Sequence, residues 1–112
     1  MSIASDLIRG HTDTIILARL MGEDNYGYEI NKSIQLKTGG KYELKEATLY
    51  TAFRRLESAG CISSYWGDEQ TGARRRYYRI TEKGRDTYAE LIKEWASAKD
   101  MIDKLIKEGD AL

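Results

Sequence analysis

The sequence predicts a mostly helical α+β fold, and three observations support this. Apolar residues recur at helical spacing in the segments before residue 60. The periodicity then changes to the alternation of two short strands, residues 62–66 and 76–80, which are joined by a polar loop. From residue 81 onward the helical spacing returns. Helices followed by a long-looped hairpin are the order of a winged helix-turn-helix, here with a long C-terminal helix.

Length and composition narrow the class of protein. The chain has 112 residues, which suits either one domain or a domain with one extra helix. With 41% hydrophobic and 32% charged residues it has the composition of a folded globular protein. No apolar run is long enough to span a membrane, and the first residues lack the pattern of a signal peptide. The single cysteine, Cys61, excludes an internal disulfide and a multi-cysteine zinc site. We therefore expect a cytoplasmic protein without a metal or cofactor.

Because the chain contains no proline, glycine is expected to separate its helices. Residues 6–21 are predicted to form one helix, with an irregularity near Gly10. Asp24 and Asn25 are the N-cap candidates for a second helix, because short polar side chains accept hydrogen bonds from the free N–H groups at a helix start. The glycines at positions 39 and 40 should end that helix in the left-handed conformation.

A third helix is predicted over residues 45–59, with Gly60 as its C-terminal cap. At 100° per residue its apolar positions form one face, which we assign to the core: Leu49, Ala52, Phe53 and Leu56. The opposite face contains no acidic residue and consists of Ala47, Tyr50, Thr51, Arg54 and Ser58, flanked by Thr48 and Arg55.

The last helix is predicted to begin after Thr81, whose hydroxyl can cap it, with Glu82 in the first turn. Its apolar residues keep the spacing of an a/d seam: Tyr88, Leu91, Trp95, Ala98, Ile102 and Leu105. We expect a partner subunit to cover this seam, and packing on the chain's own body is the alternative. Residues 1–80 would then form the winged domain and residues 81–112 a dimerisation helix.

No catalytic motif is recognisable. His11 is the single histidine and has no serine or cysteine placed for nucleophilic catalysis. Cys61 opens an apolar strand, where a small buried side chain is the expected role. No glycine-rich phosphate loop precedes a helix with the required lysine. We therefore expect a protein that is not an enzyme.

The formal net charge is zero, but the charges are unevenly distributed. Residues 41–79 contain eight basic and five acidic side chains, whereas residues 85–112 contain five basic and seven acidic ones. A basic body joined to an acidic helix is the pattern expected of a DNA-binding domain with a separate dimerisation arm.

Arginine and lysine neutralise phosphates, and hydroxyl groups can donate to phosphates or touch base edges. On this basis the candidate DNA contacts are Lys45, Thr48, Tyr50, Thr51, Arg54, Arg55, Arg74 and Arg75. Strand alternation sends Arg75 and Arg76 to opposite faces, so the arginines of the hairpin cannot all reach DNA. The alternative for these arginines is that they only keep the hairpin soluble, and Tyr77 and Tyr78 are expected to pack within it.

Several stretches, in order along nearly the whole chain, carry a family resemblance: LIRG at 7–10, YGYEI at 26–30, EATLY at 46–50, RLE at 55–57 and GARRRYYRITEKG at 72–84. With these motifs the sequence resembles the PadR family of bacterial transcriptional regulators. The resemblance implies a winged helix-turn-helix homodimer that represses a promoter, with an interface formed by the last helix and the first, where Leu7 lies. The family typically has proline where this chain has Thr51, which bears on how the recognition helix meets DNA.

Asn25-Tyr26, residues 46–51 and residues 62–69 are similar to the multidrug-responsive branch of that family. In that branch a tryptophan on the last helix faces its symmetry mate across an apolar pore where planar drugs stack, and Trp95 corresponds to it. The resemblance implies a planar aromatic drug or phenolic ligand in contact with Ile8, Tyr88, Leu91 and Trp95. The alternative is that Trp95 simply fills the interface.

The sequence thus favours a homodimeric repressor that reads a pseudo-palindromic site in double-stranded DNA, with recognition helices one turn, ~34 Å, apart. Two other functions stay open. A winged helix can also be a protein-interaction module, and a PadR-like regulator can act without a small-molecule ligand.

Overall fold

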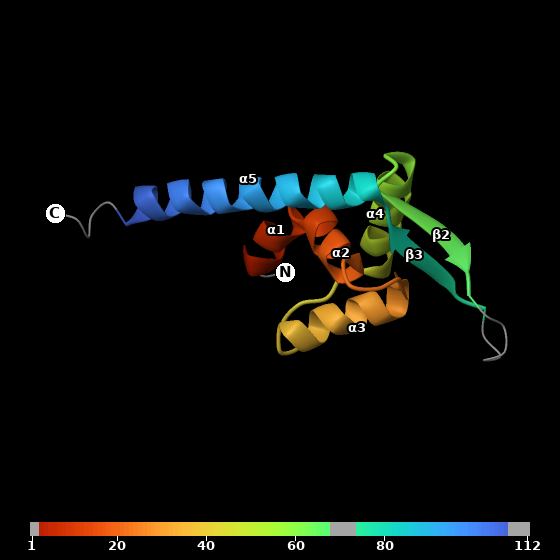
Figure 1. Cartoon of the computed structure of the whole chain (residues 1–112). Helices are drawn as coiled ribbons and strands as arrows, with labels where there is room; N and C mark the ends of the chain where they lie inside the picture. Colours follow the sequence, from red (N-terminus) through yellow and green to blue (C-terminus); the bar gives the residue numbers. More distant parts are fainter. Residues whose placement is uncertain (1–2, 68–73, 108–112) are drawn as a thin grey trace.

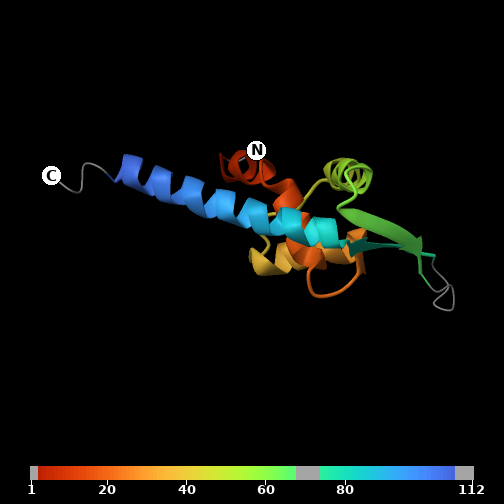
Figure 2. The same ribbon diagram turned by 45° about the horizontal axis from the view of Figure 1, so that its top comes forward.

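The computed structural model describes residues 3–67 and 74–107, with side chains from residue 6 onward. The elements follow in the order α1 (Ile3–Arg9), α2 (Thr12–Leu20), β1 (Asn25–Tyr26), α3 (Gly27–Lys37), α4 (Glu46–Ser58), β2 (Ile62–Trp66), β3 (Arg76–Ile80) and α5 (Glu82–Ile106). The helices α1 to α4 and the sheet form the body of the molecule. In both ribbon views α5 runs past α1 and α2 and continues beyond the body (Figures 1 and 2), which gives the molecule a long dimension of 64 Å against 30 and 21 Å.

The predicted hairpin is confirmed. Strands β2 and β3 pair antiparallel, with Ile62 opposite Ile80 and Tyr65 opposite Tyr77, and most of their connecting loop, residues 68–73, lies outside the described residues. Strand β1 pairs with the other edge of β3, so the sheet order is β1-β3-β2. The sequence did not indicate β1, because two residues are too few to show an alternating pattern.

The prediction of one helix over residues 6–21 was wrong. The chain breaks at residues 10 and 11, near the expected irregularity, and α1 and α2 are separate helices. The N–H of His11 donates to the carbonyl of Ile8 at 2.8 Å, and the hydroxyl of Thr12 donates to the carbonyl of Arg9 at 2.7 Å. These bonds satisfy backbone groups at the end of α1, so the chain can turn there without leaving them unpaired.

The N-cap of α3 also differs from the prediction. Tyr26, with an extended backbone, takes the cap position instead of Asp24 or Asn25. The reason is tertiary: residues 25 and 26 are held in β1 by their pairing with β3. At the other end of α3 the glycines at positions 39 and 40 have φ angles of 62° and 80°, which confirms the predicted left-handed stop.

The core lies between α2, α3, α4 and the inner face of the sheet. The four residues assigned to the inner face of α4 are all buried, which confirms that assignment. Phe53 of α4 stacks on Tyr78 of β3 with ring centroids 3.9 Å apart. Cys61 is buried as expected. Among the described residues no helix is long and apolar enough to cross a membrane.

The junction between β3 and α5 is tightly built. As predicted, the hydroxyl of Thr81 caps α5, accepting the N–H of Gly84 at 3.0 Å, while the N–H of Thr81 donates to the carbonyl of Cys61 at 3.0 Å. Gly84 is buried in the first turn of α5. A Cβ atom there would overlap the carbonyl oxygen of Cys61 and lie 2.8 Å from Cγ1 of Ile80.

We predict that Gly84→Ala lowers the free energy of unfolding by about 1 to 3 kcal/mol, because the added methyl group must displace backbone that is fixed by the sheet. Chemical denaturation measures the change. The control is Gly22→Ala, where a Cβ would meet nothing within 4 Å, and where we expect a change within about 0.5 kcal/mol. Equal stability of the two variants would contradict the tight packing of this junction.

Candidate nucleic-acid interface

Helix α4 presents its polar face to solvent. Every residue assigned to that face is exposed, and Thr48 on its flank is half-buried. Arg54 donates to the hydroxyl of Thr51 at 3.4 Å, and Lys45, the N-cap residue of α4, is exposed at the start of the helix. The two-faced character of α4 is therefore confirmed, whereas DNA contact by its exposed face stays a prediction.

Tyr50 is more constrained than its place on the outer face indicated. Its ring packs edge-on against Phe53, with centroids 5.5 Å apart. Its hydroxyl lies 2.7 Å from the position that a Cβ on Gly27 would take. Gly27 thus leaves the space in which the Tyr50 side chain lies against the start of α3. The sequence had shown Gly27 only as part of a family motif.

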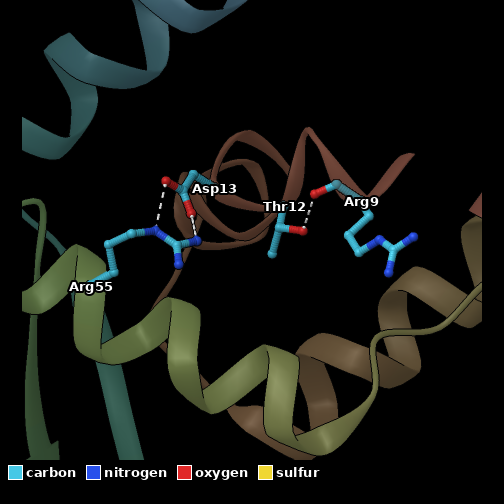
Figure 3. A network of polar contacts seen from close by, with 4 residues as sticks. All are labelled: Arg9, Thr12, Asp13 and Arg55. Atoms are coloured by element: carbon cyan, nitrogen blue, oxygen red, sulfur yellow. Dashed lines mark hydrogen bonds and ion pairs between the residues drawn. The ribbon is translucent and has the colours of Figure 1, made fainter. Parts of the chain in front are cut away.

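Arg55, on the flank of α4, reaches across to Asp13 of α2 (Figure 3). Its Nε donates to Oδ2 of Asp13 at 3.3 Å and its Nη2 bonds Oδ1 of the same carboxylate. The hydrogen bond to Asp13 raises the pKa of the Arg55 guanidinium. This pair joins two helices that are distant in the sequence, and no sequence periodicity could have indicated it.

An open cleft of about 340 Å³ lies between α4 and the junction of α1 with α2. We call it the cleft between α2 and α4, and its walls are Arg9, Thr12, Ala47, Thr48, Thr51 and Arg55. Three of these are predicted DNA contacts. Arg9 and Thr12 were missed by the sequence reasoning, because the predicted single helix would not have placed the end of α1 beside α4. The motif containing Arg9 was the one available signal.

The arginines of the hairpin lie on aromatic rings and separate by face, as strand alternation predicts. Arg74 lies over Trp66 with 4.6 Å from Cζ to the ring centroid, and Arg76 lies over the same ring at 5.7 Å. Arg76 also donates to Ser64 at 2.7 Å and pairs with Glu57 of α4 at 3.7 Å. The face that carries Arg74 and Arg76 is therefore the one beside α4.

Arg75 lies on the other face of the hairpin, over the ring of Tyr26 at 4.9 Å. Tyr77 packs there against Tyr26 and Tyr65, while Tyr78 is buried against Phe53. Desolvation by burial raises the pKa of Tyr78. Both neighbouring tyrosines thus pack within the structure, as the sequence predicted.

A second, strongly apolar groove of about 640 Å³ lies on the other side of α2, between α1, α3 and α5. Ile8 and Trp95, both predicted ligand contacts, are among its walls. The ring of His11 meets Trp95 edge-on, with centroids 4.8 Å apart. Tyr88 and Leu91 instead pack against the core of the same chain and do not line this groove.

Beyond Leu91 the seam of α5 is open except at Ala98, which is half-buried. Trp95 is 44% exposed and Leu105 is 71% exposed, and Ile102, Met101 and Ile106 are also exposed. Leu7 of α1 is likewise exposed. Within the described part of the chain no group of three or more His, Cys, Asp or Glu side chains could hold a metal ion.

A helix with a carboxylate-free outer face, held beside a hairpin with arginines, is typical of winged helix-turn-helix proteins that bind DNA. The model of the family described as "Transcriptional regulator PadR-like family" matches residues 16–90. The chain therefore belongs to the PadR-like family of transcriptional regulators.

Individual proteins are similar to this chain over most of its length. A protein of Lysinibacillus sphaericus is 49% identical over 107 residues, which are 96% of this chain and 97% of that protein. Among solved structures, a transcriptional regulator from Clostridium thermocellum is 51% identical with a TM-score of 0.84, and 92% of this chain and 100% of that chain are covered. A PadR family transcription regulator from Clostridium difficile is 37% identical with a TM-score of 0.75, over 87% and 99% of the two chains.

These relationships confirm three predictions from the sequence: the family, the winged-helix fold with a long C-terminal helix, and a function as a DNA-binding regulator instead of an enzyme. The similarity to the multidrug-responsive branch stays a prediction.

Proposed function

We propose that this PadR-family regulator is a homodimeric repressor that reads a pseudo-palindromic operator with α4. The observation that carries the proposal is the exposed outer face of α4, which includes Arg54 and the hydroxyl groups of Tyr50 and Thr51 and contains no carboxylate, because Glu46 lies outside this face. Such a face can enter the major groove, while flanking cations neutralise the phosphates on either side. Two α4 helices of a dimer, about one DNA turn or ~34 Å apart, would read the two half-sites.

Each candidate residue has a chemical role in this proposal. Lys45, Arg54 and Arg55 supply phosphate contacts, and Thr48, Tyr50 and Thr51 supply hydroxyl groups that can reach base edges or phosphates. At the hairpin the position of Arg74 on the face beside α4 favours it as a contact. Arg75 faces the other way, so it can reach only a backbone that passes that side of the hairpin.

We predict that the affinity for duplex DNA falls steeply as salt rises, because each phosphate contact releases counterions. Arg54→Gln should lower the slope of log K against log[salt] by about one per protomer. Titration of labelled duplex by fluorescence anisotropy at several salt concentrations measures this slope. Lys104→Gln is the control, because Lys104 lies on α5, paired with Asp100. Failure of the wild-type protein to bind duplex at low salt would favour the alternative, a protein-interaction module.

The exposed part of the α5 seam supports the dimer. A helix of 25 residues that leaves Trp95, Ile102 and Leu105 open to water has apolar surface to bury in a second copy. Leu7 can join that interface from α1. The first turns of α5 pack against the body through Gly84, Tyr88 and Leu91. We propose the division at residue 80, with α5 as the dimerisation helix: its part up to Leu91 is anchored on the body, and its part beyond Leu91 meets the second copy.

We predict that Leu105→Glu converts the dimer to a monomer. Leu105 is mostly exposed within its own chain, so the change should leave the fold of the protomer intact while placing a charge in the interface. Sedimentation equilibrium measures the mass, and Lys104→Glu is the control at the neighbouring position. A wild-type protein that sediments as a monomer at the same concentration would contradict the proposal.

The apolar groove beside Trp95 supports a small-molecule ligand. We propose that a planar aromatic drug or phenolic compound stacks on Trp95 at the dimer interface and contacts Ile8. In this proposal Tyr88 and Leu91, which pack against the core, lie behind these two residues. Binding would change the angle between the two winged domains and weaken DNA binding. The coupling can only equal the difference in ligand affinity between the two dimer shapes.

We predict that a planar aromatic dye quenches the fluorescence of Trp95 and shifts the DNA titration to weaker binding. Trp66→Phe provides the background for this measurement, because it leaves Trp95 as the single tryptophan and keeps a ring beneath Arg74. Trp95→Leu should abolish the effect of the dye on DNA affinity. If the dye changes neither signal, Trp95 only fills the interface and the regulator acts without such a ligand.

A further inference from the structure

Of the predicted phosphate-binding arginines on α4, Arg55 is the one held by a carboxylate from another helix. Asp13 accepts two hydrogen bonds from it, one from Nε and one from Nη2. Both side chains are only partly buried, with 52% of Arg55 and 36% of Asp13 exposed. The surface pair adds little to stability, so its main consequence is the orientation of the guanidinium.

The geometry of the pair decides which donors remain. A guanidinium is a planar fork, and a carboxylate that takes Nε and Nη2 occupies one edge of it. The Nη1 group lies off that edge, and among the described residues it donates no hydrogen bond. Because the fork is rigid, fixing one edge fixes the direction of the other.

Arg55 forms part of one wall of the cleft between α2 and α4. Thr48 and Thr51 of the same helix line it, and Arg9 and Thr12 lie opposite. Arg9 is itself paired with Asp6, one helical turn earlier. The cleft therefore offers hydroxyl and guanidinium donors directly beside the exposed face of α4, where a DNA strand that borders the major groove would pass.

We propose that Asp13 is a positioning residue for DNA binding: it holds Arg55 so that the free Nη1 edge, together with Thr48 and Thr51, receives a backbone phosphate in the cleft between α2 and α4. The inference rests on the proposed function, since it assumes that α4 meets DNA. It assigns to Asp13 a favourable contribution to binding a polyanion, although its own charge is negative.

The direction in which DNA affinity changes when Asp13 is removed tests the proposal. Removing an acidic group near DNA strengthens binding if only its charge matters, because the protein becomes more positive. Removing Asp13 weakens binding if it orients Arg55, because the released arginine side chain must lose its rotamer freedom when the phosphate binds. Asp13→Asn keeps the shape of the side chain and removes the charge, so the two effects oppose each other in one variant.

The experiment is a double-mutant cycle on the full-length protein, with Asp13→Asn, Arg55→Gln and the combined variant. Affinity is measured by anisotropy on a mixed-sequence duplex of roughly three helical turns, since phosphate contacts do not depend on sequence. Glu46→Gln is the charge-matched control, because Glu46 is exposed in the first turn of α4. Circular dichroism verifies the helix content of each variant.

We expect Asp13→Asn to weaken binding about three- to tenfold, in line with the loss of one oriented charge-assisted contact, whereas Glu46→Gln strengthens it. In the Arg55→Gln background Asp13→Asn should cause no further loss. Tighter binding by Asp13→Asn, or an equal loss in both backgrounds, would overturn the positioning role while leaving α4 as the DNA-binding helix. Absence of duplex binding by the wild-type protein would overturn the proposed function itself.

Discussion

The stacking of Phe53 on Tyr78 is the contact on which the rest of the structure depends. It joins the inner face of α4 to the central strand of the sheet, with 3.9 Å between the ring centroids. Because α4 is fixed by its inner face, its outer face is left free for a partner. Because Tyr78 lies in β3, the same contact sets where the hairpin and its arginines stand relative to α4. Because the core is closely packed, α4 and the hairpin are held in a fixed position relative to each other.

Although the net charge of the chain is zero, several of its arginines are held in defined positions by neighbouring side chains. Arg55 and Arg79 are each bonded to a carboxylate of the body, Asp13 and Asp24, and Arg74 lies on an aromatic ring. Such pairings keep guanidinium groups in place and reduce the attraction that one protomer exerts on distant phosphates. Binding by this protein would then depend on the alignment of contacts in a dimer more than on a general positive charge.

The break between α1 and α2 brings the two candidate sites of the molecule close together. His11, at the break, touches Trp95 of α5, and Asp13, two residues later, bonds Arg55 of α4. The apolar groove and the polar cleft therefore lie on opposite sides of the same short segment. Each site is built partly from the beginning of α2, so a shift of α2 would alter both.

The sequence by itself determined the family, the order of helices and hairpin, and the two faces of α4, because periodicity, glycine stops and motifs are local signals that survive without tertiary contacts. It could also place Trp95 and Leu105 on one seam of α5. It could not place Asp13 against Arg55, since those residues are distant in the chain and meet only when α2 packs beside α4. Nor could it separate Leu91, which the core covers, from Trp95 on the same stripe. The break at residue 10 is a local feature, made by hydrogen bonds to the carbonyls of Ile8 and Arg9, and the sequence indicated it only as an irregularity. Strand β1, by contrast, was decided by the tertiary structure alone, because its two residues become a strand only by pairing with β3.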